Sequence, residues 1–119
     1  MYKIFKYNIN TNTILYYIYF KTLTLKNIDN SFGHIQISID NNTMTVTSLY
    51  SRKKGCGTKL MMYSCKEQYD NGIKYIELDD CSERYREDHN IYVKFGMKYV
   101  DEYGPEMSGS IKNIINYIK

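Results

Sequence analysis

The sequence predicts one α/β domain, with a mixed, mostly antiparallel sheet, a central parallel strand pair and flanking helices. Three observations carry this prediction: an alternating hairpin in residues 35–47, a helical pattern in residues 60–69, and a short apolar strand in residues 74–80. Because strand, helix and strand in that order form a βαβ unit, the two strands are expected to lie parallel in one sheet. At 119 residues, the chain has the size of a single domain covering residues 1–119.

The first 25 residues are predicted to form a hairpin. Tyr2 to Ile9 and Ile14 to Leu25 are rich in β-branched and aromatic residues, which favour strands. Asn10, Thr11 and Asn12 between them are typical turn residues.

The second predicted hairpin has a defined register. Apolar and polar residues alternate from Ile35 to Asp40 and again from Thr43 to Thr47, around a two-residue turn, Asn41-Asn42. Such a turn pairs Asp40 with Thr43, so that Ile39 faces Met44 and Ile37 faces Val46. One face of this hairpin is therefore expected to be core.

The second half of the chain changes period. Leu60 to Tyr69 fit a helix that ends at Asn71-Gly72, and Lys74 to Asp80 read as a strand. A loop from Ser82 is expected to lead into a helix that Gly96 ends, followed by a strand from Lys98 to Tyr103. Ile111, Ile114, Ile115 and Ile118 recur at helical spacing and predict a terminal helix.

Charge and cysteine content narrow the function classes. The net charge is +3 and the basic residues are scattered, whereas a nucleic-acid-binding surface usually needs a strongly basic face, so we do not expect nucleic acid as a partner. The three cysteines show no CxxC spacing, so neither a metal site nor a disulfide framework is expected. The longest apolar run, Ile14 to Phe20, is shorter than a membrane span, and the start of the chain lacks a signal-peptide pattern. We therefore expect a cytoplasmic protein that does not enter a membrane.

A basic glycine turn precedes the first predicted helix. It reads Arg52-Lys53-Lys54-Gly55-Cys56-Gly57 and lies between an apolar strand and an amphipathic helix. The first N–H groups of a helix lack partners within the chain and favour an anion, and glycines let a phosphate approach the backbone. A simple helix entry is the alternative reading of the same residues. Neither a Walker nor a Rossmann glycine pattern is present.

Two segments resemble one enzyme family. Arg52 to Gly57 is similar to the acetyl-CoA motif Q/R-x-x-G-x-G/A of the GNAT superfamily of N-acetyltransferases. Tyr92 to Met97, which reads YVKFGM, resembles the Y-x-x-x-G-F segment of that family. The order of hairpin, glycine turn, helix, parallel strand, helix and strand is also the family's order.

The resemblance implies acetyl-CoA as cosubstrate, bound in a slot where two strands splay apart, here Thr43 to Thr47 and Lys74 to Asp80. Amides near Thr45 and Val46 would bond the pantetheine and polarise the thioester carbonyl. The pyrophosphate would lie on the turn and the helix start, which gives the remaining implied cofactor-binding residues: Arg52, Lys53, Lys54, Gly55, Cys56, Gly57, Thr58 and Lys59.

The resemblance also implies direct attack by a primary amine, either a small amine or a lysine side chain. Tyr92 matches the family tyrosine that protonates the leaving thiolate, although its apolar neighbours also fit a core residue. The usual glutamate on the fourth strand is absent, so Glu77 and Asp80 are the candidate bases, with a strand-end cap as the plainer role for Asp80.

Three other readings stay open at this stage. A catalytically silent module that binds CoA or a protein partner is favoured by the missing glutamate and by the absence of the family's first two helices. A basic nucleotide or RNA binder would use Lys53, Lys54 and exposed tyrosines. The missing helices also leave apolar strand surface uncovered, which a homodimer would cover.

Overall fold

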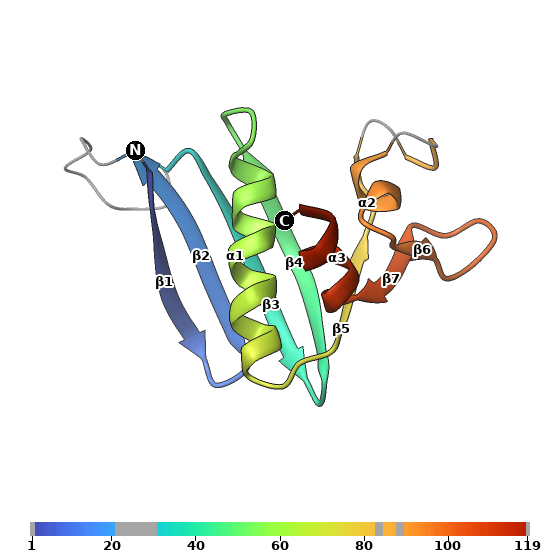
Figure 1. Cartoon of the computed structure of the whole chain (residues 1–119), viewed down its shortest axis with the longest axis horizontal. Coiled ribbons are helices and arrows are strands. Elements are labelled where there is room, and N and C mark those ends of the chain that lie inside the picture. Colours follow the sequence, from blue (N-terminus) through green and yellow to red (C-terminus); the bar gives the residue numbers. More distant parts are fainter. Residues whose placement is uncertain (1, 21–30, 83–84, 88–89, 119) are drawn as a thin grey trace.

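The computed structural model describes residues 2–20, 31–82, 85–87 and 90–118, which form one sheet with helices on one face (Figure 1). The strand order is β1-β2-β3-β4-β5-β7-β6, and among the described strands only β4 and β5 pair in parallel. The elements in chain order are β1 (Tyr2–Asn10), β2 (Thr13–Phe20), β3 (Gly33–Asp40), β4 (Thr43–Ser51), α1 (Cys56–Asp70), β5 (Tyr75–Asp79), α2 (Ile91–Lys94), β6 (Lys98–Tyr99), β7 (Glu106–Ser110) and α3 (Ile111–Ile118). This confirms the predicted mixed fold.

The β3–β4 hairpin has the register expected from its alternation. Ile39 lies opposite Met44 and Ile37 opposite Val46, around a turn in which Asn41 adopts a left-handed conformation with φ of 55°. The pairing then shifts, so that Gln36 faces Ser48 and Thr47 is left as the extra residue of a bulge. A bulge bends its strand and increases the local twist, here at the point where β4 leaves β5.

β4 and β5 separate after a short parallel stretch. Their pairing runs from Thr43 beside Tyr75 to Val46 beside Leu78, and no further. β4 continues to Ser51, whereas β5 ends at Asp79. Figure 1 shows the two strands diverging toward the end of the sheet at which α1 begins. The edge of β4 beyond Val46 therefore has no strand beside it on this side, among the residues described.

The core lies between the sheet and α1 with α3. Leu60, Met61 and Cys65 of α1 are buried against the inward isoleucines of β3, Ile35 and Ile37. α3 adds Ile111 and Ile114 to the same core, which confirms the terminal helix. Each fully buried side chain of this size contributes roughly 1.5–3 kcal/mol to folding, so α1 is fixed firmly on the sheet. Its first turn is held at the opening between β4 and β5.

The region after β5 differs most from the expected order. The strand expected from Lys98 to Tyr103 stops at Tyr99, and β7, which the sequence did not predict, follows the intervening loop. β7 reads EMSGS, a poor strand sequence, but Met107 is buried opposite Leu78 of β5. A Cβ at Gly109 would meet the Met97 side chain at 3.1 Å, so Met97 packs closely on the strand at this glycine.

Two further expectations concern the second strand and the short helix after β5. The predicted strand to Leu25 ends at Phe20 within the described part, and residues 21–25 lie outside it. The helix expected after the loop from Ser82 is α2, and it ends just before Gly96, as predicted. A search of the described helices finds none with the length and apolar character that crossing a bilayer requires.

Candidate functional site

A cavity of about 640 Å³ occupies the opening between β4 and β5. Its β4 wall consists of residues 45–49, and its β5 wall includes Glu77 and Asp79. Glu77 lies beside Thr45 in the sheet, so both side chains are on the face opposite α1. Tyr92 of α2 and Glu106 of β7 also line this cavity.

A second cavity of about 200 Å³ lies at the start of α1. It is lined by Gly55, Gly57 and Thr58 and shares Leu49 and Tyr92 with the larger cavity. The two cavities therefore meet at these shared residues. Together they lead from the N-terminus of a 15-residue helix into the opening between the strands.

Backbone donors are exposed at this helix start. Gly55 precedes α1 with φ of 89°, a left-handed conformation that favours glycine, and no described side chain caps the helix. The Cys56 amide donates to the Lys53 carbonyl at 3.1 Å, whereas the amides of Gly57 and Thr58 have no acceptor among the described residues. Free N–H groups and the positive end of the helix dipole make this a suitable place for a phosphate.

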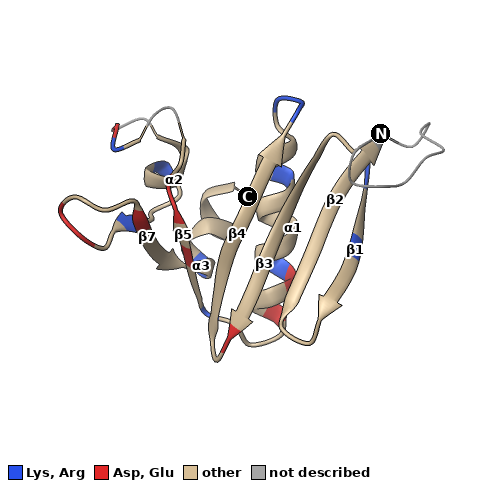
Figure 2. Cartoon of the chain, turned by 180° about the vertical axis from the view of Figure 1, so that it is seen from behind, with Lys and Arg blue, Asp and Glu red and all other residues tan. Residues whose placement is uncertain are grey.

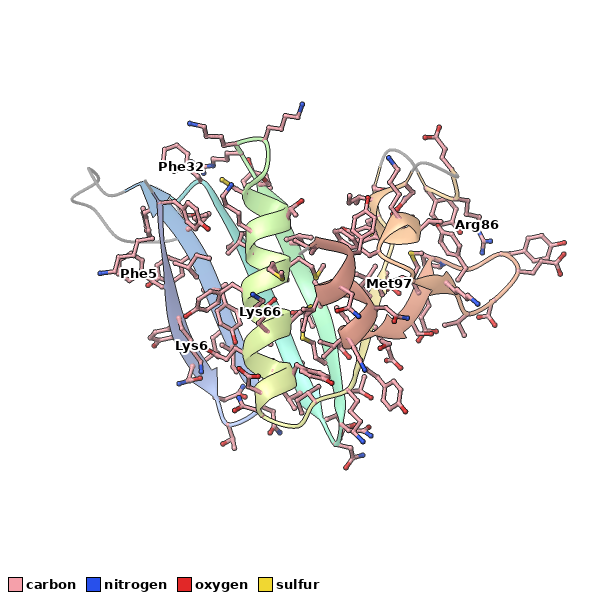
Figure 3. All side chains as sticks on the ribbon, in the orientation of Figure 1. Phe5, Lys6, Phe32, Lys66, Arg86 and Met97 are labelled. Atoms are coloured by element: carbon pink, nitrogen blue, oxygen red, sulfur yellow. The ribbon has the colours of Figure 1, made fainter. Side chains whose placement is uncertain are left out.

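The predicted cofactor-binding residues are not all equally placed. Arg52, Lys53 and Lys54 are exposed on the loop, with Lys53 Nζ 5.7 Å from the ring centre of Phe32 (Figure 3). The side chain of Cys56 is buried in the core. The Lys59 amide donates to the Gly55 carbonyl, and its ammonium lies 5.1 Å from the ring centre of Tyr2 and close enough to the start of α1 that a Cβ on Gly55 would meet it at 3.8 Å.

Tyr92 lies where the two cavities meet. Its ring packs edge-on against Phe95, with centroids 6.4 Å apart. Its hydroxyl has no hydrogen-bond partner among the described residues, and no described buried polar atom is left unsatisfied, so the hydroxyl opens into the cavity. Burial, followed by the charges of Asp80 and Cys81, raises the pKa of Tyr92, which keeps the phenol protonated at neutral pH.

The two candidate bases have different surroundings. Glu77 faces the cavity, and the structure gives its carboxylate no salt bridge among the described residues. Asp80 is only 2% exposed and accepts hydrogen bonds from Ser82, Asn90 and Tyr99. Burial alone would raise the pKa of Asp80, but these hydrogen bonds outweigh it and hold the pKa below its usual value. Asp80 is thus a hydrogen-bonded group behind the cavity wall rather than on it.

The architecture matches that of solved N-acetyltransferases. The PaiA N-acetyltransferase from Thermoplasma acidophilum, solved with coenzyme A, aligns with a TM-score of 0.62 and 19% identity, over 83% of this chain and 61% of that chain. The ribosomal-protein-S18-alanine N-acetyltransferase from Escherichia coli aligns with a TM-score of 0.68 and 10% identity, over 93% of this chain and 94% of that chain. A GNAT-family acetyltransferase from Staphylococcus aureus Mu50 aligns with a TM-score of 0.61 and 14% identity, over 83% of this chain and 68% of that chain. This chain has the GNAT fold.

Comparison of the sequence with models of protein families and with curated proteins found no match. The likeness in structure therefore concerns the GNAT fold, and this chain spans about three fifths of the Thermoplasma protein. A tight turn from Asn10 to Thr13 joins the first two strands of this chain.

Sequence reasoning missed three parts of this GNAT-fold site. Glu106 reaches the cavity from the unpredicted strand β7. Asn90 caps α2, with its side chain accepting from the Tyr92 amide at 2.8 Å. Tyr99 donates to Asp80 at 2.5 Å. Asparagine is a favoured N-cap residue, so Asn90 before the predicted helix was a signal in the sequence. The places of Glu106 and Tyr99 depend on strand pairing, which no local pattern reveals.

Proposed function

We propose that this chain binds acetyl-CoA and transfers its acetyl group to a primary amine. The observation that carries the proposal is the position of the Tyr92 hydroxyl, unpartnered in the described structure at the junction of the two cavities. One cavity offers free amides for a pyrophosphate and the other offers carboxylates for an amine. A protonated phenol between them lies where a thiolate would be released.

The cosubstrate follows the two cavities in this proposal. Its pyrophosphate binds the amides of Gly57 and Thr58, with Arg52 and Lys54 near its charged end. Its pantetheine runs along the edge of β4 that β5 leaves uncovered beyond Val46. A backbone amide near this point polarises the thioester carbonyl, as an oxyanion hole does.

The reaction is a direct displacement. The neutral amine nitrogen attacks the thioester carbonyl carbon, a C–N bond forms, and the C–S bond breaks when the tetrahedral intermediate collapses. Glu77 accepts a proton from the amine through water, and Tyr92 donates its proton to the leaving thiolate. The proton that Glu77 takes balances the one that Tyr92 gives, so the neutral amine and acetyl-CoA yield an N-acetyl amine and CoA thiol. When the acceptor arrives as a cation, it first loses one proton to solvent.

The acceptor is a cationic amine in this proposal. Glu77, Asp79 and Glu106 bring three carboxylates to one cavity, and Figure 2 shows acidic residues along β5 and at the start of β7. Basic residues gather instead on the loop between β4 and α1. The anionic cosubstrate and the cationic acceptor are therefore attracted to opposite ends of the site.

Glu77→Gln tests the base. The amide keeps the shape of the side chain but cannot take the proton, so we expect kcat/KM to fall roughly 10- to 100-fold at neutral pH with acetyl-CoA affinity unchanged. Steady-state kinetics and calorimetry measure the two quantities. Asp40→Asn, which removes a carboxylate at the distant end of β3, is the matched control. An equal loss in both variants would contradict the assignment.

The rival function is a silent CoA-binding module. It is favoured by β4, which carries no glutamate, and by the tight turn that joins β1 to β2. The deciding experiment supplies saturating acetyl-CoA with small amines, polyamines and lysine peptides and detects acetylated product by mass spectrometry. Binding of acetyl-CoA with no product from any acceptor would select the module.

We also propose a homodimer formed by the free edge of β1. In an antiparallel pair centred on Phe5, Lys3 of one copy lies opposite Tyr7 of the other. A pairing shifted so that its centre is Lys6 would instead place the two Lys6 residues opposite each other. The residue Tyr7 is 59% exposed. Tyr7→Lys would place a second lysine opposite Lys3 at both ends of the pairing, and the like charges would repel. We therefore expect sedimentation velocity to show a dimer for the wild type and a monomer for the variant. A monomeric wild type at high micromolar concentration would refute this pairing.

A further inference from the structure

Asp80 is the centre of a compact hydrogen-bond cluster behind the cavity. Its Oδ1 accepts from the Ser82 amide at 3.0 Å and from the Ser82 hydroxyl at 2.5 Å. Its Oδ2 accepts from Asn90 Nδ2 at 2.9 Å and from the Tyr99 hydroxyl at 2.5 Å. Both oxygens are acceptors, so a carboxylate is the side chain that satisfies all four donors.

Asn90 joins this cluster to the helix that carries Tyr92. Its Nδ2 donates to Asp80, while its Oδ1 accepts from the Tyr92 amide at 2.8 Å and so caps α2. Asn90 is 1% exposed, and its amide orientation is set by the carboxylate: only with Nδ2 toward Asp80 does Oδ1 face the helix. The two contacts are therefore made by opposite ends of one side chain.

The far side of the cluster is fixed by Arg86, which is labelled in Figure 3. Its amide donates to the Tyr99 hydroxyl at 2.7 Å, and its guanidinium lies 4.3 Å from the centre of the Tyr99 ring. The same guanidinium donates to the carbonyls of Asp101 and Gly104. Arg86 holds φ of 61°, an uncommon conformation for a residue other than glycine, and these contacts maintain it.

We propose that Asp80 is a positioning residue which, through the orientation of the Asn90 amide, fixes the start of α2 and the Tyr92 hydroxyl in the cavity. α2 has only four residues, too few to be stable without such support. This inference rests on the proposed function in one respect, which is that Tyr92 takes part in catalysis. The placement of Tyr92 by Asp80 can be tested without any substrate.

An exchange of the two side chains provides the test. Asn90→Asp keeps an oxygen for the Tyr92 amide but sets a second carboxylate against Asp80 in a buried place. Asp80→Asn removes one of the two acceptor oxygens. The double variant restores one carboxylate and one amide in reversed order, so that a donor and an acceptor meet again. Asp40→Asn serves as the control for loss of a carboxylate elsewhere.

The readout is hydrogen exchange of the Tyr92 amide, with the Leu60 amide of α1 as internal reference and thermal unfolding as the check on folding. In Asn90→Asp we expect the Tyr92 amide to exchange roughly tenfold faster, with Leu60 unchanged, and the double variant to recover most of the protection. Unchanged exchange at Tyr92 in folded Asn90→Asp would overturn the inference. So would a folded double variant that recovers nothing.

Activity separates this inference from the proposed function. If the wild type transfers acetyl, kcat should fall in Asn90→Asp with KM for acetyl-CoA within a few-fold, and should recover in the double variant. In a Tyr92→Phe background the same substitution should add little further loss, because both changes act on one hydroxyl. If the wild type transfers nothing, the proposed function fails, while the exchange data still judge the placement of Tyr92.

Discussion

Tyr92→Phe should lower kcat roughly 10- to 1000-fold, while acetyl-CoA affinity stays within a few-fold and thermal stability is nearly unchanged. The substitution keeps the ring and its contact with Phe95 and removes only a hydroxyl that has no partner among the described residues. Without this proton donor, the negative charge that develops on sulfur as the C–S bond breaks is not neutralised, so collapse of the tetrahedral intermediate is slower. Stopped-flow or steady-state release of CoA thiol measures the loss.

The pH dependence of the same reaction follows from the direction of the pKa shift. A general acid acts in its protonated form, and burial raises the pKa of Tyr92. We therefore expect kcat of the wild type to fall at alkaline pH as Tyr92 ionises, and this fall to begin above the usual tyrosine pKa. The Tyr92→Phe variant should not show this fall. Tyr69→Phe, on the exposed side of α1, is the matched control. A large loss of stability with normal turnover would show that Tyr92 serves the core alone.

The parts of the fold that the sequence predicts are those with a local period. Ile35, Ile37 and Ile39 alternate because one sheet face is buried, and the spacing from Ile111 to Ile118 reflects one buried helix face. β7 could not be predicted, because Met107 is its one apolar residue among glutamate, serine and glycine, and its strand conformation comes from pairing with β5. The short β6 has the same origin, since only Lys98 and Tyr99 find partners on β7.

The candidate site divides in the same way. The glycine turn is a local pattern, so its place at the start of α1 was predicted from sequence. The environment of Asp80 is not local: Tyr99 reaches it from 19 residues away and Asn90 from 10. A carboxylate at a strand end looks equally suited to catalysis and to capping until those partners are known. The four donors around Asp80 favour the second role, and leave Glu77 as the base in our proposal.

Gly57→Asp should weaken acetyl-CoA binding roughly 100-fold or more, because a carboxylate would stand beside the bound pyrophosphate. The variant should still fold. A Cβ at this position would meet Ser51 Cβ at 3.6 Å, an ordinary contact, and Gly57 lies in the first turn of α1. A negative charge in the first turn of a helix stabilises it by about 0.3–1 kcal/mol. The same substitution is thus expected to preserve or raise stability while weakening acetyl-CoA binding.

Calorimetry with acetyl-CoA and thermal unfolding measure these opposite effects, and two controls separate their causes. Gly57→Ala adds the Cβ without the charge, so we expect a smaller loss of affinity that reports on close approach alone. Asn116→Asp adds the same charge on the exposed side of α3, and should leave affinity unchanged. If folded Gly57→Asp bound acetyl-CoA as tightly as the wild type, the pyrophosphate could not lie on this helix start, and the free amides of Gly57 and Thr58 would need another explanation.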